Sequence, residues 1–223
     1  MTRRAVTPRA ALMAAGIFAC SLLAGCGFDP VNLVVNQKEV EEQTPYVAVP
    51  NQQAWVNPGA VTFVMQRGLL GGSEQRIGLR NALEIPGDNQ MVLRSRAGNL
   101  AAARFRFEEF MTRVGGAPAP FEGITSGDLL TAEDEFGVYH WAEKNFGSDI
   151  TCVFAVRRLT SAARDLPGEA LVLDIMLRNC LRGSSAEALA PIAPESIGFS
   201  ARAAAPVPHG TRLLSPLAAP GLD

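Results

Sequence analysis

Two long runs of β-forming residues stand out in the second half of the chain. They cover Asp149–Leu159 and Ala170–Cys180, and the turn sequence DLPG around Leu166 separates them. If the runs pair as a hairpin that is symmetric about Leu166, the residue numbers of any two partners add up to 332. Cys152 then lies directly opposite Cys180, where cross-strand Cβ atoms come close to disulfide distance. The hairpin therefore predicts a Cys152–Cys180 disulfide.

Three shorter β-type segments precede this hairpin. They cover residues 60–66, 74–81 and 90–95, and turn sequences rich in glycine separate them. The sequence IPGDN (Ile85–Asn89) is typical of the turn that joins the last two. We therefore expect these two segments to pair with each other.

The segment NLAAARFRFEEFMTRVGG predicts a helix. Asn99 can cap its start, Gly115 and Gly116 end it, and apolar residues recur at helical spacing between them. Phe105 lies off this stripe, so a strand over Ala103–Phe107 is the alternative.

A second, shorter helix is expected after the hairpin. Ser184 and Ser185 can cap it, Glu187 falls in its first turn, and Pro194 ends it.

These elements predict one α+β domain over residues 59–200, with a mainly antiparallel sheet and about two helices. Residues 26–58 are polar and interrupted by prolines, which is typical of a flexible tether. Residues 201–223 are rich in alanine and proline without periodicity, and we expect them to form a disordered tail.

Residues 1–25 have the features of a lipoprotein signal peptide. Three arginines precede an uncharged, mostly apolar run from Ala10 to Leu23, which is too short to span a bilayer as a helix. The sequence LAGC, which ends at Cys26, then resembles a bacterial lipobox. In that kind of signal the cysteine becomes the first residue of the mature protein and carries lipid. The alternative is an ordinary signal peptide with an incidental cysteine.

A lipid on Cys26 would attach the protein to a membrane without a transmembrane helix. We expect the chain to be anchored in the cell envelope and to face the periplasm. Gly27, rather than aspartate, follows the cysteine. This favours the outer membrane over the inner one.

The charge balance narrows the classes of partner. The whole chain has 20 basic and 22 acidic residues, and removal of the three arginines in the signal segment leaves 17 basic and 22 acidic, a net charge of −5. An acidic body of this kind argues against nucleic acid as a partner and against a polybasic contact with anionic lipid.

Cysteine usage points to an oxidising compartment. Cys20 lies in the segment that is removed and Cys26 is modified, so Cys152 and Cys180 remain as a pair. Two buried free thiols are the alternative. We expect no metal site and no cofactor, because neither His140 nor His209 stands at ligand spacing from a cysteine.

Two segments contain residue patterns that occur in catalytic or phosphate-binding sites. Glu133, Asp134 and Glu135 are adjacent, and two of them could serve a glycosidase-type reaction, although three such carboxylates usually form a solvated edge. The sequence GLLGG (Gly68–Gly72) lacks the lysine and the hydroxyl residue of a phosphate-binding loop and predicts a turn.

The sequence VYHWAE predicts a strand with aromatic residues on one face. Tyr139 and Trp141 share that face and could stack on sugar rings if they are exposed. His140 lies on the opposite face, where a partly buried structural histidine is expected.

Three segments, QRIGLRNALEIPGDN, GVYHWAEKNFGSDITCVFAVRRL and LDIMLRNCLRGSSAEAL, resemble the BcsN family of cellulose biosynthesis lipoproteins of alphaproteobacteria. The likeness covers roughly residues 60–195. Cys152–Phe154 and Arg178–Arg182 match the two places where the family has a Cys-aromatic strand and an Arg-x-Cys-Arg-like segment. The chain departs from the family at Ala155 and Val156, where the family tends to carry a tryptophan. The resemblance implies an accessory envelope protein encoded with a cellulose synthase system, and it brings no catalytic residues with it.

The sequence thus favours a lipid-anchored protein that is not an enzyme. It would support cellulose or other exopolysaccharide production through contacts with components of the cellulose synthase complex or with glycan. The alternatives are a general envelope-assembly lipoprotein and a carboxylate-dependent polysaccharide hydrolase.

Overall fold

The structure, a computed structural model, describes residues 41, 43–98 and 104–198. The signal peptide, Cys26, Asn99, His209 and the C-terminal tail lie outside the described residues. All described residues belong to one unit, which begins at Glu41.

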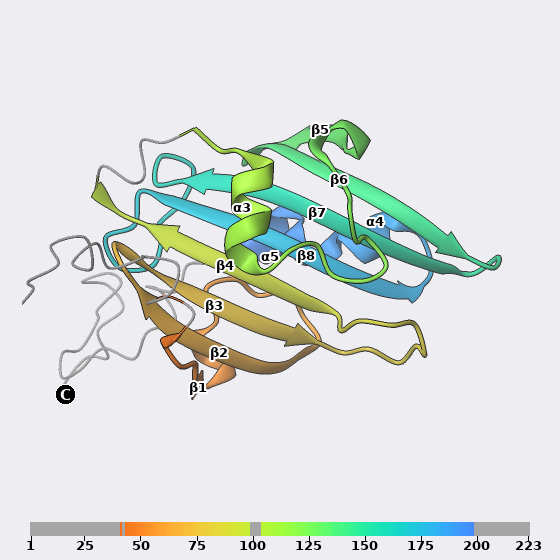
Figure 1. Ribbon diagram of the computed structural model, residues 1–223, viewed down its shortest axis with the longest axis horizontal. Coiled ribbons are helices and arrows are strands. Elements are labelled where there is room, and N and C mark those ends of the chain that lie inside the picture. The colour runs from red at the N-terminus through yellow and green to blue at the C-terminus, as the bar shows by residue number, and fades with distance from the viewer. Residues whose placement is uncertain (1–40, 42, 99–103, 199–223) are drawn as a thin grey trace, which may run out of the picture. The chain divides into compact units, whose positions relative to one another are not determined.

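Eight strands form a single sheet in the order β1-β2-β3-β4-β8-β7-β6-β5, and every neighbouring pair is antiparallel (Figure 1). The expected α+β class with a mainly antiparallel sheet is confirmed. The strands are β1 (Val47–Val49), β2 (Val61–Leu69), β3 (Gly72–Leu79), β4 (Gln90–Arg96), β5 (Leu130–Asp134), β6 (Gly137–Phe146), β7 (Ile150–Thr160) and β8 (Val172–Arg182).

The β7–β8 hairpin has the register that the sequence predicts. Its pairs run from Ile150 opposite Arg182 to Thr160 opposite Val172, and the numbers of all partners add up to 332. Cys152 lies opposite Cys180, and the two sulfur atoms are bonded at 1.99 Å. The connection is longer than a tight turn because Leu166, at its centre, folds back and is buried in the core.

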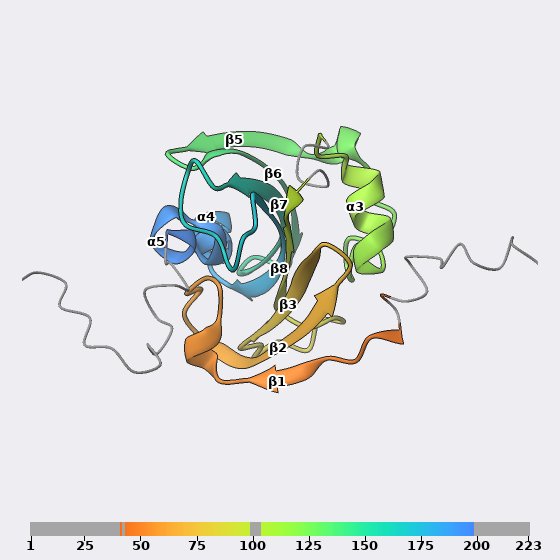
Figure 2. The same cartoon turned by 90° about the vertical axis from the view of Figure 1, so that its left-hand side faces the viewer.

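The central strands are buried on both faces, since successive side chains of a strand point to opposite sides. One core contains Val153, Ala155 and Ile175 and is covered by the helical segments α4 (Ser185–Leu189), η5 (Ala190–Ile192) and α5 (Pro194–Ile197). The other contains Phe154, Val156 and Met176 and is covered by helix α3 (Phe107–Val114). Figure 2 shows α3 on one side of β7 and β8, and α4 and α5 on the other.

Helix α3 is shorter than expected. Arg104–Arg106 are not helical, Arg106 is the N-cap, and the helix begins only at Phe107. The prediction of a continuous helix from Asn99 is therefore wrong, and so is the alternative prediction of a strand that includes Phe107. The end is as predicted, because Gly115 takes a left-handed conformation with φ of 94° that suits glycine.

The short helix after the hairpin begins as expected. Ser184 caps α4 and forms a capping box with Glu187. Pro194 ends the first helical segment but also begins α5, since proline fits the first position of a helix.

The expected boundary between tether and domain at residue 59 is wrong. Strand β1 pairs with β2, and the short helical turn η2 (Asn51–Gln53) leads into the buried residues Trp55 and Val56. The backbone N–H of Trp55 donates to Oε1 of Gln75 at 2.8 Å. Pro45, Pro50 and Pro58 therefore lie in or beside a packed edge segment of the domain and not in a free tether.

Candidate functional site

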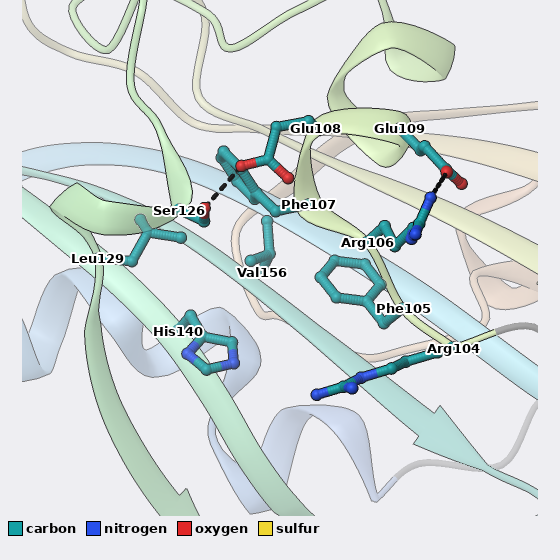
Figure 3. A pocket seen from close by; sticks show the side chains of 10 residues that line it. All are labelled: Arg104, Phe105, Arg106, Phe107, Glu108, Glu109, Ser126, Leu129, His140 and Val156. Carbon is teal, nitrogen blue, oxygen red and sulfur yellow. Dashed lines mark hydrogen bonds and ion pairs between the residues drawn. The ribbon is translucent and has the colours of Figure 1, made fainter.

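A pocket of about 520 Å³ opens between the start of α3 and strands β6 and β7 (Figure 3). Its apolar lining consists of Phe105, Phe107, Leu129 and Val156. Its polar lining consists of Arg104, Arg106, Glu108, Glu109, Ser126 and His140. The volume lies in the range of about 300–1,000 Å³ that is typical of small-ligand sites.

The non-helical segment before α3 explains why aromatic side chains line this pocket. Phe107 is buried against the sheet and meets the edge of Phe154 at a ring distance of 6.1 Å. Phe105 is only partly buried, with its ring 5.6 Å from that of Phe110. The guanidinium of Arg158 lies 5.2 Å from the Phe105 ring. Phe105 is therefore held in place from the core side while it still lines the cavity.

Both carboxylates at the pocket are engaged with neighbouring groups. Arg106 donates to Glu109 at 2.8 Å, and this hydrogen bond lowers the pKa of the Glu109 carboxyl. The hydroxyl of Ser126, in the turn η4 (Ser126–Asp128), donates to Glu108 at 2.6 Å and lowers the pKa of that carboxyl too. Both groups are exposed and stay ionised at neutral pH.

Two cationic or donor side chains at the pocket have few partners. Nδ1 of His140 lies 3.1 Å from Oγ1 of Thr131, its partner across β5 and β6. Arg104 forms no hydrogen bond or ion pair with any other described residue, and its side chain points toward His140 in Figure 3. Arg104 therefore offers donors to a ligand, and the second ring nitrogen of His140 donates or accepts according to the tautomer.

The proposed sugar contact at Tyr139 and Trp141 stays a prediction, and the structure leaves only part of each ring accessible. Tyr139 and Trp141 do share one face of β6, but that face packs against the core under α4 and α5, and both side chains are partly buried. The guanidinium of Arg157 lies 5.3 Å from the Tyr139 ring. The pocket instead lies on the His140 side of the strand.

The acidic triplet holds a structural ion pair. Asp134 accepts two hydrogen bonds of 2.8 Å from Arg157, whose fully buried guanidinium also donates to the carbonyl of Ile192 at 3.0 Å. The hydrogen bonds from Arg157 lower the pKa of the Asp134 carboxyl. A general acid needs the opposite shift. Glu133 and Glu135 are exposed on either side.

A row of charges crosses the sheet and was not expected from the sequence. Five residues of alternating charge are successive partners on five neighbouring strands, in the order Arg67, Glu74, Arg94, Asp174 and Arg158. Glu74 lies 3.1 Å from Arg67 and 3.2 Å from Arg94, and Asp174 lies 2.6 Å from Arg158. The only signal in the sequence was that charged residues occur within or next to the β-type runs, and such residues normally indicate solvent-facing positions.

The segment before β1 closes over one end of this row. The Tyr46 hydroxyl donates to Glu74 and accepts from Nε of Arg76 at 2.7 Å, while Arg67 lies 4.5 Å from the Tyr46 ring. Burial, and then the hydrogen bond to Glu74, raise the pKa of Tyr46 to about 12. Glu41 forms an ion pair with Arg94. The row thus ties the start of the domain to the sheet.

Arg178, in the segment that resembles the family motif, also has a structural role. It is fully buried, and its guanidinium donates to the carbonyls of Ala119 at 2.9 Å and Pro86 at 2.8 Å and to Oδ1 of Asn89 at 2.6 Å. Burial lowers its pKa. Arg178 therefore fixes two loops to the end of the disulfide hairpin.

In the described part of the chain, no group of three His, Cys, Asp or Glu side chains is placed to hold a metal ion. Within the same residues, no helix is both long and apolar enough to cross a membrane.

Fold and site together define an α+β protein with one antiparallel sheet, covered on both faces, and a lateral pocket of mixed polarity. In comparisons with known proteins, no family model, no curated protein and no solved structure matches the chain.

Proposed function

We propose that this chain is a lipid-anchored envelope protein that supports exopolysaccharide production, cellulose in the first place, without catalysing a reaction. The membrane contact would be the lipid on Cys26, and the domain would bind components of the cellulose synthase complex or glycan. The link to cellulose rests on the resemblance of three segments to the BcsN family.

The observation that carries this proposal is the Cys152–Cys180 disulfide. Disulfides persist in oxidising compartments such as the periplasm and are rare in the cytosol. Together with the LAGC sequence that ends at Cys26, the disulfide supports export followed by lipid attachment.

The environment of the acidic triplet supports a binding role over hydrolysis. The candidate carboxylate of Asp134 already neutralises the buried Arg157, and its pKa is lowered. Most other charged side chains on the central strands are likewise engaged with one another across the sheet. The lateral pocket, by contrast, offers donors to a ligand.

Metabolic labelling with palmitate tests the anchor. We expect label on the wild-type protein, recovery of that protein in the membrane fraction, and loss of both in Cys26→Ser. A chain that stays unlabelled, or that is recovered in the cytosol, contradicts the proposal. Cys152 and Cys180 provide a check within the same sample, because a reductant-dependent shift in electrophoretic mobility reports that the chain was oxidised.

Deletion of the gene, followed by measurement of cellulose with a dye that binds glucan, tests the role. We expect reduced cellulose that the wild-type gene restores and the Cys26→Ser gene does not. Normal polysaccharide combined with a leaky envelope would favour a general envelope-assembly lipoprotein instead. The triple change Glu133→Gln, Asp134→Asn and Glu135→Gln tests the hydrolase alternative, and unchanged polysaccharide in this variant would contradict it. Folding must be monitored, because Asp134→Asn breaks the ion pair with Arg157. The double change Glu133→Gln and Glu135→Gln leaves that ion pair intact and serves as the comparison.

A further inference from the structure

The lateral pocket combines an apolar wall with two side chains, Arg104 and His140, that have hydrogen-bonding groups to spare. Phe105 and Leu129 are partly buried, and Phe107 and Val156 are buried behind them. The Arg104 guanidinium has five N–H donors, and the second ring nitrogen of His140 is not used by Thr131. A ligand that satisfies both parts must have an apolar face and strong acceptors.

The carboxylates at the rim do not cancel this preference. Glu109 faces Arg106 at 2.8 Å and Arg113 at 3.6 Å, and Glu108 accepts from Ser126. The charge of Glu109 is thus matched by these two arginines. The Ser126 hydroxyl is neutral, so Glu108 keeps its negative charge, but its side chain is directed at Ser126 and away from Arg104 (Figure 3). Among the described residues that line the pocket, Arg104 is the arginine without a carboxylate partner.

We propose that this pocket binds an acidic saccharide, that is, a sugar ring that carries a carboxylate. The choice of a saccharide rests on the proposed function in exopolysaccharide production. Arg104 pairs with the carboxylate, because a planar guanidinium matches it with two parallel hydrogen bonds. His140 binds a ring hydroxyl or ring oxygen, and Phe105 contacts the apolar CH face of the sugar, as aromatic rings do.

This arrangement discriminates between three kinds of ligand. A neutral glucan has no carboxylate to pair with Arg104. Inorganic phosphate can pair with Arg104 but has no apolar face to contact Phe105. A uronic acid oligomer uses both. The pocket is large enough for such a ligand, at about 520 Å³.

Calorimetry on the full chain, purified from detergent-solubilised membranes, tests the proposal. The probes are a glucuronic acid trimer, cellotriose and inorganic phosphate at the same ionic strength. We expect the acidic trimer to bind at least about tenfold more tightly than the other two, because only it engages both the charge and the ring. Cellotriose or phosphate that binds as tightly as the trimer overturns the proposal, and so does a trimer that does not bind.

Three variants identify the site. Arg104→Gln, at an exposed position that carries no packing, is expected to weaken binding of the trimer by about tenfold or more. Phe105→Leu keeps an apolar side chain against Phe110 but removes the flat ring, and we expect a similar loss. Arg80→Gln is the matched control, because Arg80 is an exposed arginine that does not line this pocket. Equal losses in Arg104→Gln and Arg80→Gln would reduce the effect to overall charge and refute the assignment.

The result of the binding measurement does not depend on whether Cys26 carries lipid. Binding is measured on purified protein, so failure of palmitate labelling would remove the proposed function and leave the pocket result standing. Conversely, if the protein is labelled with palmitate but its pocket binds no acidic sugar, the proposed lipid anchor stands and the proposed ligand is refuted.

Discussion

The side chain of Asn89 completes the hydrogen bonding of Cys180 just before strand β4 begins. Its Oδ1 accepts the backbone N–H of Cys180 at 2.7 Å, and its Nδ2 donates to the carbonyl of the same residue at 2.8 Å. Strand β4 begins only at Gln90, opposite Arg178, so the amide replaces a missing strand residue. Asn89, the last residue of the IPGDN turn, thus stabilises the disulfide hairpin directly.

We expect Asn89→Ala to lower the free energy of unfolding by about 3 kcal/mol, because it leaves both backbone groups of the buried Cys180 without partners. Urea denaturation followed by circular dichroism measures the change. Asn145→Ala, at an exposed position of β6, is the control and should stay within about 0.5 kcal/mol of wild type. If Asn89→Ala lowers the free energy of unfolding no more than the control does, the hydrogen bonds from Asn89 to Cys180 do not stabilise the domain.

Removal of the disulfide should destabilise the domain without changing its register. The bond closes a loop with a sequence separation of 28, for which the chain-entropy model gives about 3.5 kcal/mol. We expect the double change Cys152→Ala and Cys180→Ala to lower the unfolding free energy by that order, with the native circular dichroism spectrum retained. Wild-type protein in reductant is the comparison, and unchanged stability in both cases would contradict a formed bond.

The hairpin could be predicted because all its information is local. Two β-type runs of equal length flank one turn, so a single centre of symmetry fixes every partner, Cys152 and Cys180 included. Local signals also located the end of α3 at Gly115 and the start of α4 at Ser184. Each of these depends on residues within a few positions of one another.

The features that the sequence did not reveal depend on partners far apart in the chain. The buried Trp55 is bonded through its backbone to the side chains of Gln75 and Arg164, which lie 20 and 109 positions further along the chain, and no residue near Trp55 indicates this burial. The alternating charges from Arg67 to Arg158 look like separate exposed positions until five strands are set side by side. The two faces of β6 were assigned correctly, but which of them is covered depends on where α4 packs.

Tyr46 should be detectable by its late titration. Burial and the hydrogen bond to Glu74 raise its pKa from 10.0 to about 12, so the folded chain holds this proton when the unfolded chain has lost it. The stability that this provides is complete below pH 10 and is lost as the pH rises to about 12. We expect the unfolding free energy of wild type to fall more steeply over that interval than that of Tyr46→Phe.

Absorbance at the tyrosinate band gives a direct check, because the chain has two tyrosines. We expect Tyr46→Phe to remove the step near pH 12 and Tyr139→Phe to retain it. Retention of the late step in Tyr46→Phe would contradict the contact with Glu74. At neutral pH, Tyr46→Phe should cost about 2 kcal/mol, because a hydrogen bond to a buried carboxylate is lost.

The ion pair between Arg157 and Asp134 should govern part of the acid stability of the domain. Arg157 is fully buried and Asp134 is its counter-charge, so Asp134→Asn leaves a buried cation without compensation and should cost about 3 kcal/mol at neutral pH. Because the hydrogen bonds from Arg157 lower the pKa of the Asp134 carboxyl in the folded state, the unfolded chain takes up this proton first as the pH falls. The contribution is therefore present above about pH 4 and is lost below it.

Denaturation curves between pH 7 and pH 2 test this. The free energy of unfolding should fall less steeply with acid in Asp134→Asn than in wild type, while the variant of the exposed neighbour, Glu133→Gln, follows wild type. An acid profile for Asp134→Asn that parallels wild type would mean that Asp134 is not the anion that holds Arg157, and it would make this carboxylate available for other roles again.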